Sequence, residues 1–168
     1  MQKPSLSIRP AGEADLPAIL AIYNDAVANT TAIWNETPSD LEGRRNWWRE
    51  RAGAGFPVLV GETGGEVAGY ATYGPFRPHE GYRHTVENSV YVREESRGKG
   101  VAAALMAALI DQARVDGFHV MVAGVEAGNL ASIRLHERLG FQEVARMPEV
   151  GRKFGRWLDL VLMQKMLG

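Results

Sequence analysis

The sequence predicts an α/β domain in which the strands of a sheet alternate with amphipathic helices. Residues 85–92 place β-branched and aromatic side chains in near alternation, and residues 102–114 repeat alanine and leucine at helical spacing. Residues 58–62 and 66–73 flank a glycine turn, which is typical of a β-hairpin. Residues 157–166 are apolar on both faces. We therefore expect this last strand to be buried, in part by another subunit.

Two helices are predicted before and after a polar segment near the N-terminus. Residues 6–10 form a short first strand, and the acidic residues at 13–15 begin the first helix. The residues expected on its buried face are Leu16, Ile19, Leu20, Tyr23 and Val27. Residues 39–42 read Ser-Asp-Leu-Glu, the spacing of a capping box, so the second helix is predicted to begin there. The tryptophans at 47–48 are expected to be half-buried on that helix.

The second half of the chain continues the alternation. The helix at 102–114 is expected to end at Asp116-Gly117, and residues 118–124 are predicted to be the next strand. A fourth helix is predicted over residues 129–138, before a glycine. Residues 142–146 and the last strand then close the sheet.

Composition limits the class of protein. The 168 residues carry a net charge of −1, which gives no general reason to bind nucleic acid or an acidic membrane. No apolar run is long enough to span a bilayer, and the first residues hold no apolar signal region, so we expect one cytoplasmic domain over residues 1–168. The absence of cysteine removes disulfides, thiolate metal sites and an enzyme thioester intermediate. The four histidines lack metal-ligand spacing, so we expect no metal.

A basic glycine loop joins the central strand to the third helix. Gly98 and Gly100 lie where the loop becomes the helix, so backbone N–H groups there can approach a ligand without interference from a Cβ atom. The first N–H groups of a helix lack internal partners and favour an anion. Arg93, Arg97 and Lys99 flank the loop and favour a polyphosphate over a plain turn. The Walker spacing and the three-glycine dinucleotide fingerprint are both absent.

Two motifs resemble the GNAT superfamily of N-acetyltransferases. Arg97-Gly98-Lys99-Gly100-Val101-Ala102, after a Val-Tyr-Val strand, is similar to the acetyl-CoA loop of that superfamily, and residues 129–141 resemble its Asn-containing helix and Gly-Phe turn. A narrower resemblance, to the phosphinothricin and methionine sulfone/sulfoximine N-acetyltransferase branch, covers nearly the whole chain. The segments that carry it are residues 22–27, 32–36, 69–71, 85–87, 147–151 and 153–159.

The resemblance implies a GNAT-like fold with a mixed, mostly antiparallel central sheet flanked by about four helices. It also implies a homodimer, acetyl-CoA as co-substrate, and transfer of acetyl to the α-amine of a small amino-acid-like acceptor. The acetyl-CoA site is expected to include Val90, Tyr91, Val92, Arg97, Gly98, Lys99, Gly100, Val101, Ala102, Ala103 and Asn129. The acceptor site is expected to include Trp34, Glu36, Arg77, Pro78, His79, Glu87, Asn88, Ser89, Lys153 and Phe154.

Several of these residues also have plainer explanations. Trp34 can be a lid over packed residues, and Asn129 can be an ordinary helix N-cap. The loop that contains Arg77 can simply be solvated, although an arginine fork also matches the carboxylate of an amino acid. Lys153 and Phe154 can do no more than turn the last hairpin.

Glu87 is the candidate general base. It lies inside an otherwise apolar strand, where a buried carboxylate is costly without a purpose or a partner. An α-amine titrates near pH ~7.7–8.0, so a modest base suffices to remove its proton before attack on a thioester. The alternative is that Glu87 faces solvent or pairs with Arg83. In the resembling branch this Glu lies at the acceptor amine.

The backbone of the same strand and one helix residue are the other candidates for chemistry. If the neighbouring strand splays away, unpaired backbone groups can bind the amides of pantetheine, and the N–H near Val90 can polarise the thioester carbonyl. Many GNAT enzymes have a Tyr where this chain has His136, so His136 is a candidate acid for the leaving thiolate. Its alternative role is that of a hydrogen-bonded, partly buried side chain.

Two rival functions stay open at this point. A peptide or lysine N-acetyltransferase should have an open groove, whereas the segment around Trp34 and the loop of residues 77–84 suggest enclosure. A non-catalytic acyl-CoA-binding sensor has no use for Glu87, so a solvent-exposed Glu87 far from the thioester would favour that rival.

Overall fold

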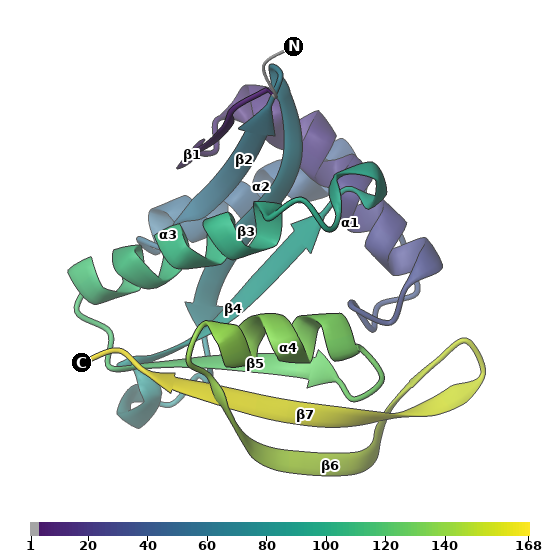
Figure 1. Ribbon diagram of the computed structural model, residues 1–168, viewed down its shortest axis with the longest axis vertical. Helices are drawn as coiled ribbons and strands as arrows, with labels where there is room; N and C mark the ends of the chain where they lie inside the picture. The colour runs from purple at the N-terminus through teal and green to yellow at the C-terminus, as the bar shows by residue number, and fades with distance from the viewer. Residues whose placement is uncertain (1–3) are drawn as a thin grey trace.

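The computed structural model describes residues 4–168, which form one seven-stranded sheet with four α-helices around it (Figure 1). The strand order is β1-β2-β3-β4-β5-β7-β6. The strands are β1 (Leu6–Pro10), β2 (Val58–Thr63), β3 (Glu66–Pro75), β4 (Thr85–Val92), β5 (Val120–Glu126), β6 (Gln142–Lys153) and β7 (Arg156–Met166). The helices are α1 (Leu16–Asn29), α2 (Leu41–Gly53), α3 (Val101–Val115) and α4 (Leu130–Arg138). Only β4 and β5 pair in parallel, which confirms the predicted mixed, mostly antiparallel sheet.

Helices cover both faces of the sheet (Figure 1). On one face, α3 and α4 contribute Leu105, Leu109 and Ile133 to a core that includes Val86 of β4 and Met163 of β7. On the other face, the apolar side of α1 packs against β2 and β3, and the tryptophans of α2 lie at the edge of that smaller core. No helix among residues 4–168 is both long and apolar enough to cross a membrane.

The sheet opens in its middle. β4 pairs with β3 along its whole length, from Val86 to Val92. It pairs with β5 only at residues 85–87, whereas β5 pairs with β7 on its other edge along its whole length, from Val120 to Glu126. The last five residues of β4 therefore have one edge without a strand partner, which is the splay that binding of pantetheine amides by this strand requires.

Two details of the N-terminal helices differ from the predictions. The N-cap of α2 is Asp40, whose Oδ1 accepts from the N–H of Gly43 at 2.7 Å, and not Ser39. On α1, Ile22 and Ala26 are buried, whereas Leu20 and Tyr23 are only half-buried. The buried stripe is turned towards Ile22 because α1 packs on β3 and β4 on one side only, while Arg44 of α2 covers the Tyr23 ring at 3.9 Å.

The last hairpin is longer than predicted. β6 continues beyond residue 146 to Lys153, past a bulge between Met147 and Gly151 where Glu149 has a φ of 55°. Within this chain β7 is only partly buried. Val161 and Met163 are buried in the core that includes α3, whereas Leu160 and Leu162 on the opposite face are half-buried and Trp157 is 57% exposed. Trp157 is exposed because it adjoins the turn between β6 and β7, beyond the core that holds Val161 and Met163.

Candidate active site

The glycine loop forms the start of α3 as a cradle of backbone N–H groups. Gly98 and Gly100 have φ values of 72° and 83°, the left-handed region that side chains with a Cβ rarely adopt. The N–H of Ala104 is the first to bond within the helix, to the Gly100 carbonyl at 3.1 Å. The N–H groups of residues 101–103 therefore have no partner within the helix, and they face a cavity. Together with the helix dipole they fit a phosphate group.

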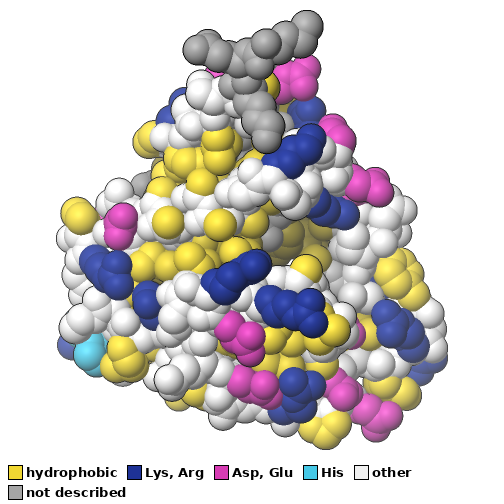
Figure 2. Space-filling model, in the orientation of Figure 1, with side chains coloured by type: hydrophobic (Ala, Val, Ile, Leu, Met, Phe, Trp, Pro, Cys, Tyr) yellow, Lys and Arg dark blue, Asp and Glu magenta, His cyan; other side chains and the backbone are white. Residues whose placement is uncertain are grey.

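This cavity occupies about 1190 Å³ between α3, α4, the open edge of β4 and the segment after α1. Figure 2 shows it as a hollow across the molecule with apolar side chains on its floor and Lys and Arg side chains beside it. Ten of the predicted acetyl-CoA residues line it: Val90, Tyr91, Val92, Arg97, Gly98, Gly100, Val101, Ala102, Ala103 and Asn129. The eleventh, Lys99, does not line it, because its ammonium donates to the Glu95 carbonyl at 2.7 Å.

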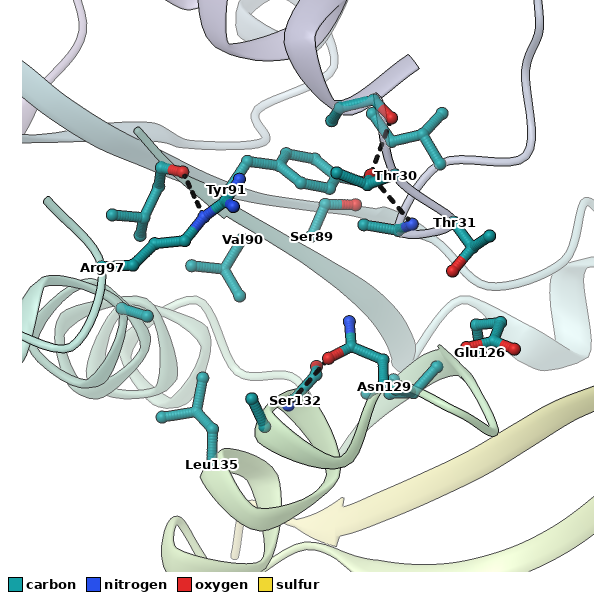
Figure 3. Close-up of a pocket in the computed structure, with 18 of the residues that line it drawn as sticks. Thr30, Thr31, Ser89, Val90, Tyr91, Arg97, Glu126, Asn129, Ser132 and Leu135 are labelled. Carbon is teal, nitrogen blue, oxygen red and sulfur yellow. Dashed lines mark hydrogen bonds between the residues drawn. The ribbon is translucent and has the colours of Figure 1, made fainter. Parts of the chain in front are cut away.

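Arg97 and Asn129 lie at opposite walls of the cavity (Figure 3). Arg97 donates from Nε to the Val92 carbonyl at 3.3 Å and has Asp25 at 3.7 Å, which leaves its guanidinium half exposed beside the cradle. Asn129 is the N-cap of α4, since its side chain accepts from the Ser132 N–H at 3.2 Å. Its capping role is therefore confirmed, and its side-chain amide N–H group stays available to the cavity.

The backbone of β4 presents hydrogen-bonding groups to the same cavity. The carbonyl of His84 accepts from His119 and Val120 on the β5 side, whereas the N–H of Arg93 donates to Ala68 on the β3 side. Because backbone groups alternate along a strand, the even-numbered residues face β5. Val90 thus has its N–H and carbonyl at the open edge, where no strand satisfies them. The geometry fits the predicted oxyanion donor.

Glu87 lies on the face of the sheet away from α3 and α4, because it alternates with Val86 and Asn88, which face these helices. It borders a smaller cavity of about 230 Å³ that adjoins the first one. Glu87 is exposed, as its alternative predicted, yet it lines both cavities, and partial desolvation by their walls raises the pKa of its carboxyl against the lowering effects of Arg77 and Arg51. A raised pKa makes the carboxylate a stronger base. Arg83 donates to the Glu80 carbonyl instead, and no ion pair joins it to Glu87 among residues 4–168.

The predicted acceptor residues divide into two groups. Trp34, Asn88, Ser89 and Phe154 line the large cavity together with Glu87, and Trp34 also lines the small one. The others do not line either cavity: Glu36, Arg77, Pro78, His79 and Lys153. The 77–79 loop is exposed and reaches the site only through the charge of Arg77. The enclosure expected from it therefore comes from the segment of residues 30–34 alone.

Lys153 is completely buried and holds that segment in place. Its ammonium donates to the carbonyls of Thr30 and Ile33 at 2.7 and 2.6 Å, and burial lowers its pKa. The ring of Trp34 lies directly against Gly151, where an added Cβ would come within 2.1 Å of it. The tip of the β6–β7 hairpin thus fixes one wall of both cavities, which is a positioning role for Lys153 and not a direct contact with the acceptor.

His136 is buried on α4, with 2% of its surface exposed. Its Nδ1 is 2.7 Å from the Ser132 carbonyl, which only accepts, so Nδ1 carries the proton. Its Nε2 then accepts from the Asn88 amide at 3.1 Å. Burial lowers the pKa of the imidazole, with the Ser132 bond acting in the opposite direction. This arrangement supports the alternative of a hydrogen-bonded, neutral side chain, and the acid role stays a prediction.

The lowered pKa of His136 predicts a pH-dependent stability. An unfolded histidine titrates near pH ~6.5. The folded state binds its proton only at lower pH, so stabilisation from neutral His136 is present above the unfolded pKa and is lost as pH falls through it. We expect His136→Gln to flatten this part of the pH profile. Urea unfolding gives the free energy of unfolding of both proteins at pH 8 and pH 5.5. If this free energy falls by the same amount between the two pH values in both proteins, the assignment is contradicted.

Sequence reasoning missed five residues of the small cavity: Ala32 in the segment after α1, and Gly124, Glu126, Leu160 and Leu162 on the sheet. Glu87 pairs with Val122, and Gly124 and Glu126 pair with Leu162 and Leu160, so the period of two places all of these side chains on one face. The alternation from residue 122 to 126 was visible in the sequence. What it did not reveal is that β5 leaves β4 after residue 122 and exposes this face.

The chain matches the Acetyltransferase (GNAT) family over residues 19–141. It is 63% identical over 161 residues to the L-methionine sulfoximine/L-methionine sulfone acetyltransferase of Pseudomonas paraeruginosa, covering 95% of this chain and 94% of that protein. It is 40% identical over 162 residues to the phosphinothricin N-acetyltransferase of Alcaligenes faecalis, covering 96% and 82%.

Two solved structures have the same fold. One is yncA of Salmonella typhimurium with its cofactor acetyl-CoA, with a TM-score of 0.95, 53% identity and coverage of 97% of this chain and 94% of that one. The other is the ribosomal-protein-alanine N-acetyltransferase of Brucella melitensis, with a TM-score of 0.94, 60% identity and coverage of 95% and 99%. With the glycine cradle, the splayed strands and the carboxylate beside them, these likenesses show that the chain belongs to the GNAT family of acetyltransferases.

Proposed function

We propose that this N-acetyltransferase transfers acetyl from acetyl-CoA, in the cytoplasm, to the α-amine of a small amino-acid-like acceptor. The observation that carries the proposal is the small cavity around Glu87, on the opposite side of the splay from the phosphate cradle. Its volume of about 230 Å³ lies below the roughly 300–1,000 Å³ of sites for drug-sized ligands. It suits one amino acid better than a peptide chain.

The acceptor type is supported by the relatives. The Pseudomonas paraeruginosa enzyme is named for methionine sulfoximine and methionine sulfone, and the Alcaligenes faecalis enzyme for phosphinothricin. All three molecules are α-amino acids with a side chain of moderate length. The Brucella melitensis protein is named for a ribosomal-protein alanine, which keeps a peptide N-terminus as the second candidate acceptor.

The residues at the splay can divide the chemistry among them. The α3 cradle and Arg97 hold the phosphates of the donor, and the open edge of β4 binds its amide groups. Bound there, acetyl-CoA supplies an activated acetyl group as a thioester. Glu87 accepts a proton from the acceptor ammonium, so that the free amine can form the new C–N bond while the C–S bond breaks. The Val90 N–H donates to the carbonyl oxygen as negative charge develops on it.

The test is a panel of acceptors assayed for CoA release. We expect turnover of methionine sulfone, methionine sulfoximine or phosphinothricin, and much slower turnover of a peptide that begins with alanine. The reverse order would favour the peptide enzyme. Acetyl-CoA binding without CoA release for any acceptor would favour the sensor.

We also propose a homodimer. Apolar side chains lie exposed on the last hairpin, among them Val144, Met147, Val150 and Trp157, and β6 has no strand neighbour on its outer edge. Light scattering at micromolar concentration should give twice the monomer mass. Val144→Lys should reduce this mass, whereas Val115→Lys, on a valine that is 81% exposed on α3, should not. A monomer in the unaltered protein would count against the dimer.

A further inference from the structure

Glu126 is a second carboxylate at the small cavity, and no cation of residues 4–168 forms an ion pair with it. It ends β5 and faces both cavities, across the gap from Thr31 (Figure 3). Among residues 4–168 it has no ion pair and no side-chain hydrogen bond. Its carboxylate bends back over Gly128, where an added Cβ would lie 2.9 Å from Oε2. The carboxylate can lie there because residue 128 is glycine and has no Cβ atom.

Gly124 leaves space open beside Glu126. Its φ is not in the left-handed region, and a Cβ added there would meet Leu160 Cδ1 at 3.5 Å, an ordinary contact. Neither the backbone nor the packing requires glycine, although glycine inside a strand weakens the strand. A side chain at this position would project into the cavity between Glu87 and Glu126. The glycine thus keeps open the floor on which an acceptor side chain can lie.

The walls of this cavity have a distinct chemical character. Leu160 and Leu162 form an apolar floor beside Gly124, and the indole of Trp34 faces it from the other side. The only ionisable side chains among its lining residues are Glu87 and Glu126, and both are acids. With Glu87 at the acceptor amine, Glu126 is left to face the acceptor side chain, because it lies four residues farther along the same face than the partner of Glu87.

We infer that Glu126 determines specificity by charge. It admits acceptors whose side chain is uncharged, such as methionine sulfone and methionine sulfoximine, and it disfavours acceptors with an anionic side chain, such as phosphinothricin. The apolar floor takes the methylene groups of either kind, so the discrimination lies in the group at the end of the side chain. This inference rests on the proposed function, whose acceptors include both classes.

The expected change in acceptor preference is that caused by one unit charge in a small and partly solvated cavity. At that range the repulsion between two anions changes a binding constant by about tenfold, after allowance for solvent and salt screening. Glu126→Gln keeps the shape and removes the charge. We expect it to raise the kcat/KM for phosphinothricin relative to that for methionine sulfone by about tenfold, with the KM for acetyl-CoA unchanged. Higher salt should shift the unaltered enzyme in the same direction.

The control is Glu137→Gln, which makes the same charge change on an exposed residue of α4 outside both cavities. It should leave the ratio unchanged. Inhibition of methionine sulfone acetylation by glutamate and glutamine, which have the same shape and differ in charge, supplies a second readout that does not require these two molecules to be acetylated. Glutamine should inhibit the unaltered enzyme better, and Glu126→Gln should remove that preference.

The two proposals fail in different ways. If Glu126→Gln acetylates methionine sulfone normally and leaves both the acceptor ratio and the inhibitor preference as they were, the charge selection is overturned and the proposed function stands. If the unaltered enzyme acetylates none of these amino acids, the proposed function is overturned. Glu126→Ala, which also enlarges the cavity, should shift both readouts in the same direction as Glu126→Gln.

Discussion

Glu87→Gln is expected to lower kcat at pH 7 by about 10²–10⁴-fold, the usual contribution of a positioned base. Glutamine keeps the size and hydrogen-bonding shape of the side chain but cannot take a proton. The acetyl-CoA affinity should be intact, because the phosphate cradle lies on the other side of the splay. Steady-state kinetics with calorimetric binding of acetyl-CoA measure both quantities.

The pH profile separates a base from the other possible roles of Glu87. Its raised pKa predicts that the activity of the unaltered enzyme falls with pH as the carboxylate is protonated, at a higher pH than an ordinary Glu would give. In Glu87→Gln, a higher pH should recover part of the loss by deprotonating the free amine in solution. A residue that only positions the acceptor would change KM at every pH, and a structural one would lower the melting temperature. Near-normal kcat at pH 7 would remove Glu87 from the mechanism.

The acetyl-CoA half of the site could be predicted from the sequence because its main residues are close together in the chain. Gly98, Gly100 and the first turn of α3 are consecutive, and their chemistry comes from backbone geometry that the glycines themselves require. The strand before them has a clear period of two, so it was also predictable that the side chains of Glu87 and Asn88 lie on opposite faces of the sheet. Ten of eleven predicted residues line the cavity for that reason.

The acceptor half was less predictable because it is assembled from distant segments. Trp34 reaches it by packing on Gly151, and Lys153 is turned away from it because two carbonyls of residues 30–33 satisfy its ammonium. Glu126 reaches it only because β5 parts from β4 after residue 122. Hydrophobic periodicity reports which face a side chain is on, but not where a pairing ends. The point at which β5 parts from β4 is therefore the feature that a single sequence did not reveal.

Gly100→Val is expected to weaken acetyl-CoA binding by about 100-fold, the loss of roughly two charge-assisted hydrogen bonds. A valine does not readily adopt the φ of 83° at this N-cap, so the first turn of α3 has to rearrange and its free N–H groups lose their common direction. The added side chain would also occupy the space in front of those groups. Calorimetry with acetyl-CoA gives the affinity, and thermal unfolding shows whether the protein is folded.

Gly117→Val is the matched control for this prediction. Gly117 follows the other end of α3, has the same φ of 83°, and likewise has no atom within 4 Å of an added Cβ. Backbone strain of about 1–3 kcal/mol is expected in both variants. Both should therefore lose similar stability, whereas only Gly100→Val should lose acetyl-CoA affinity, because Gly117 lies outside the cavity. Equal affinities in the two folded variants would show that the N-terminus of α3 does not hold the donor.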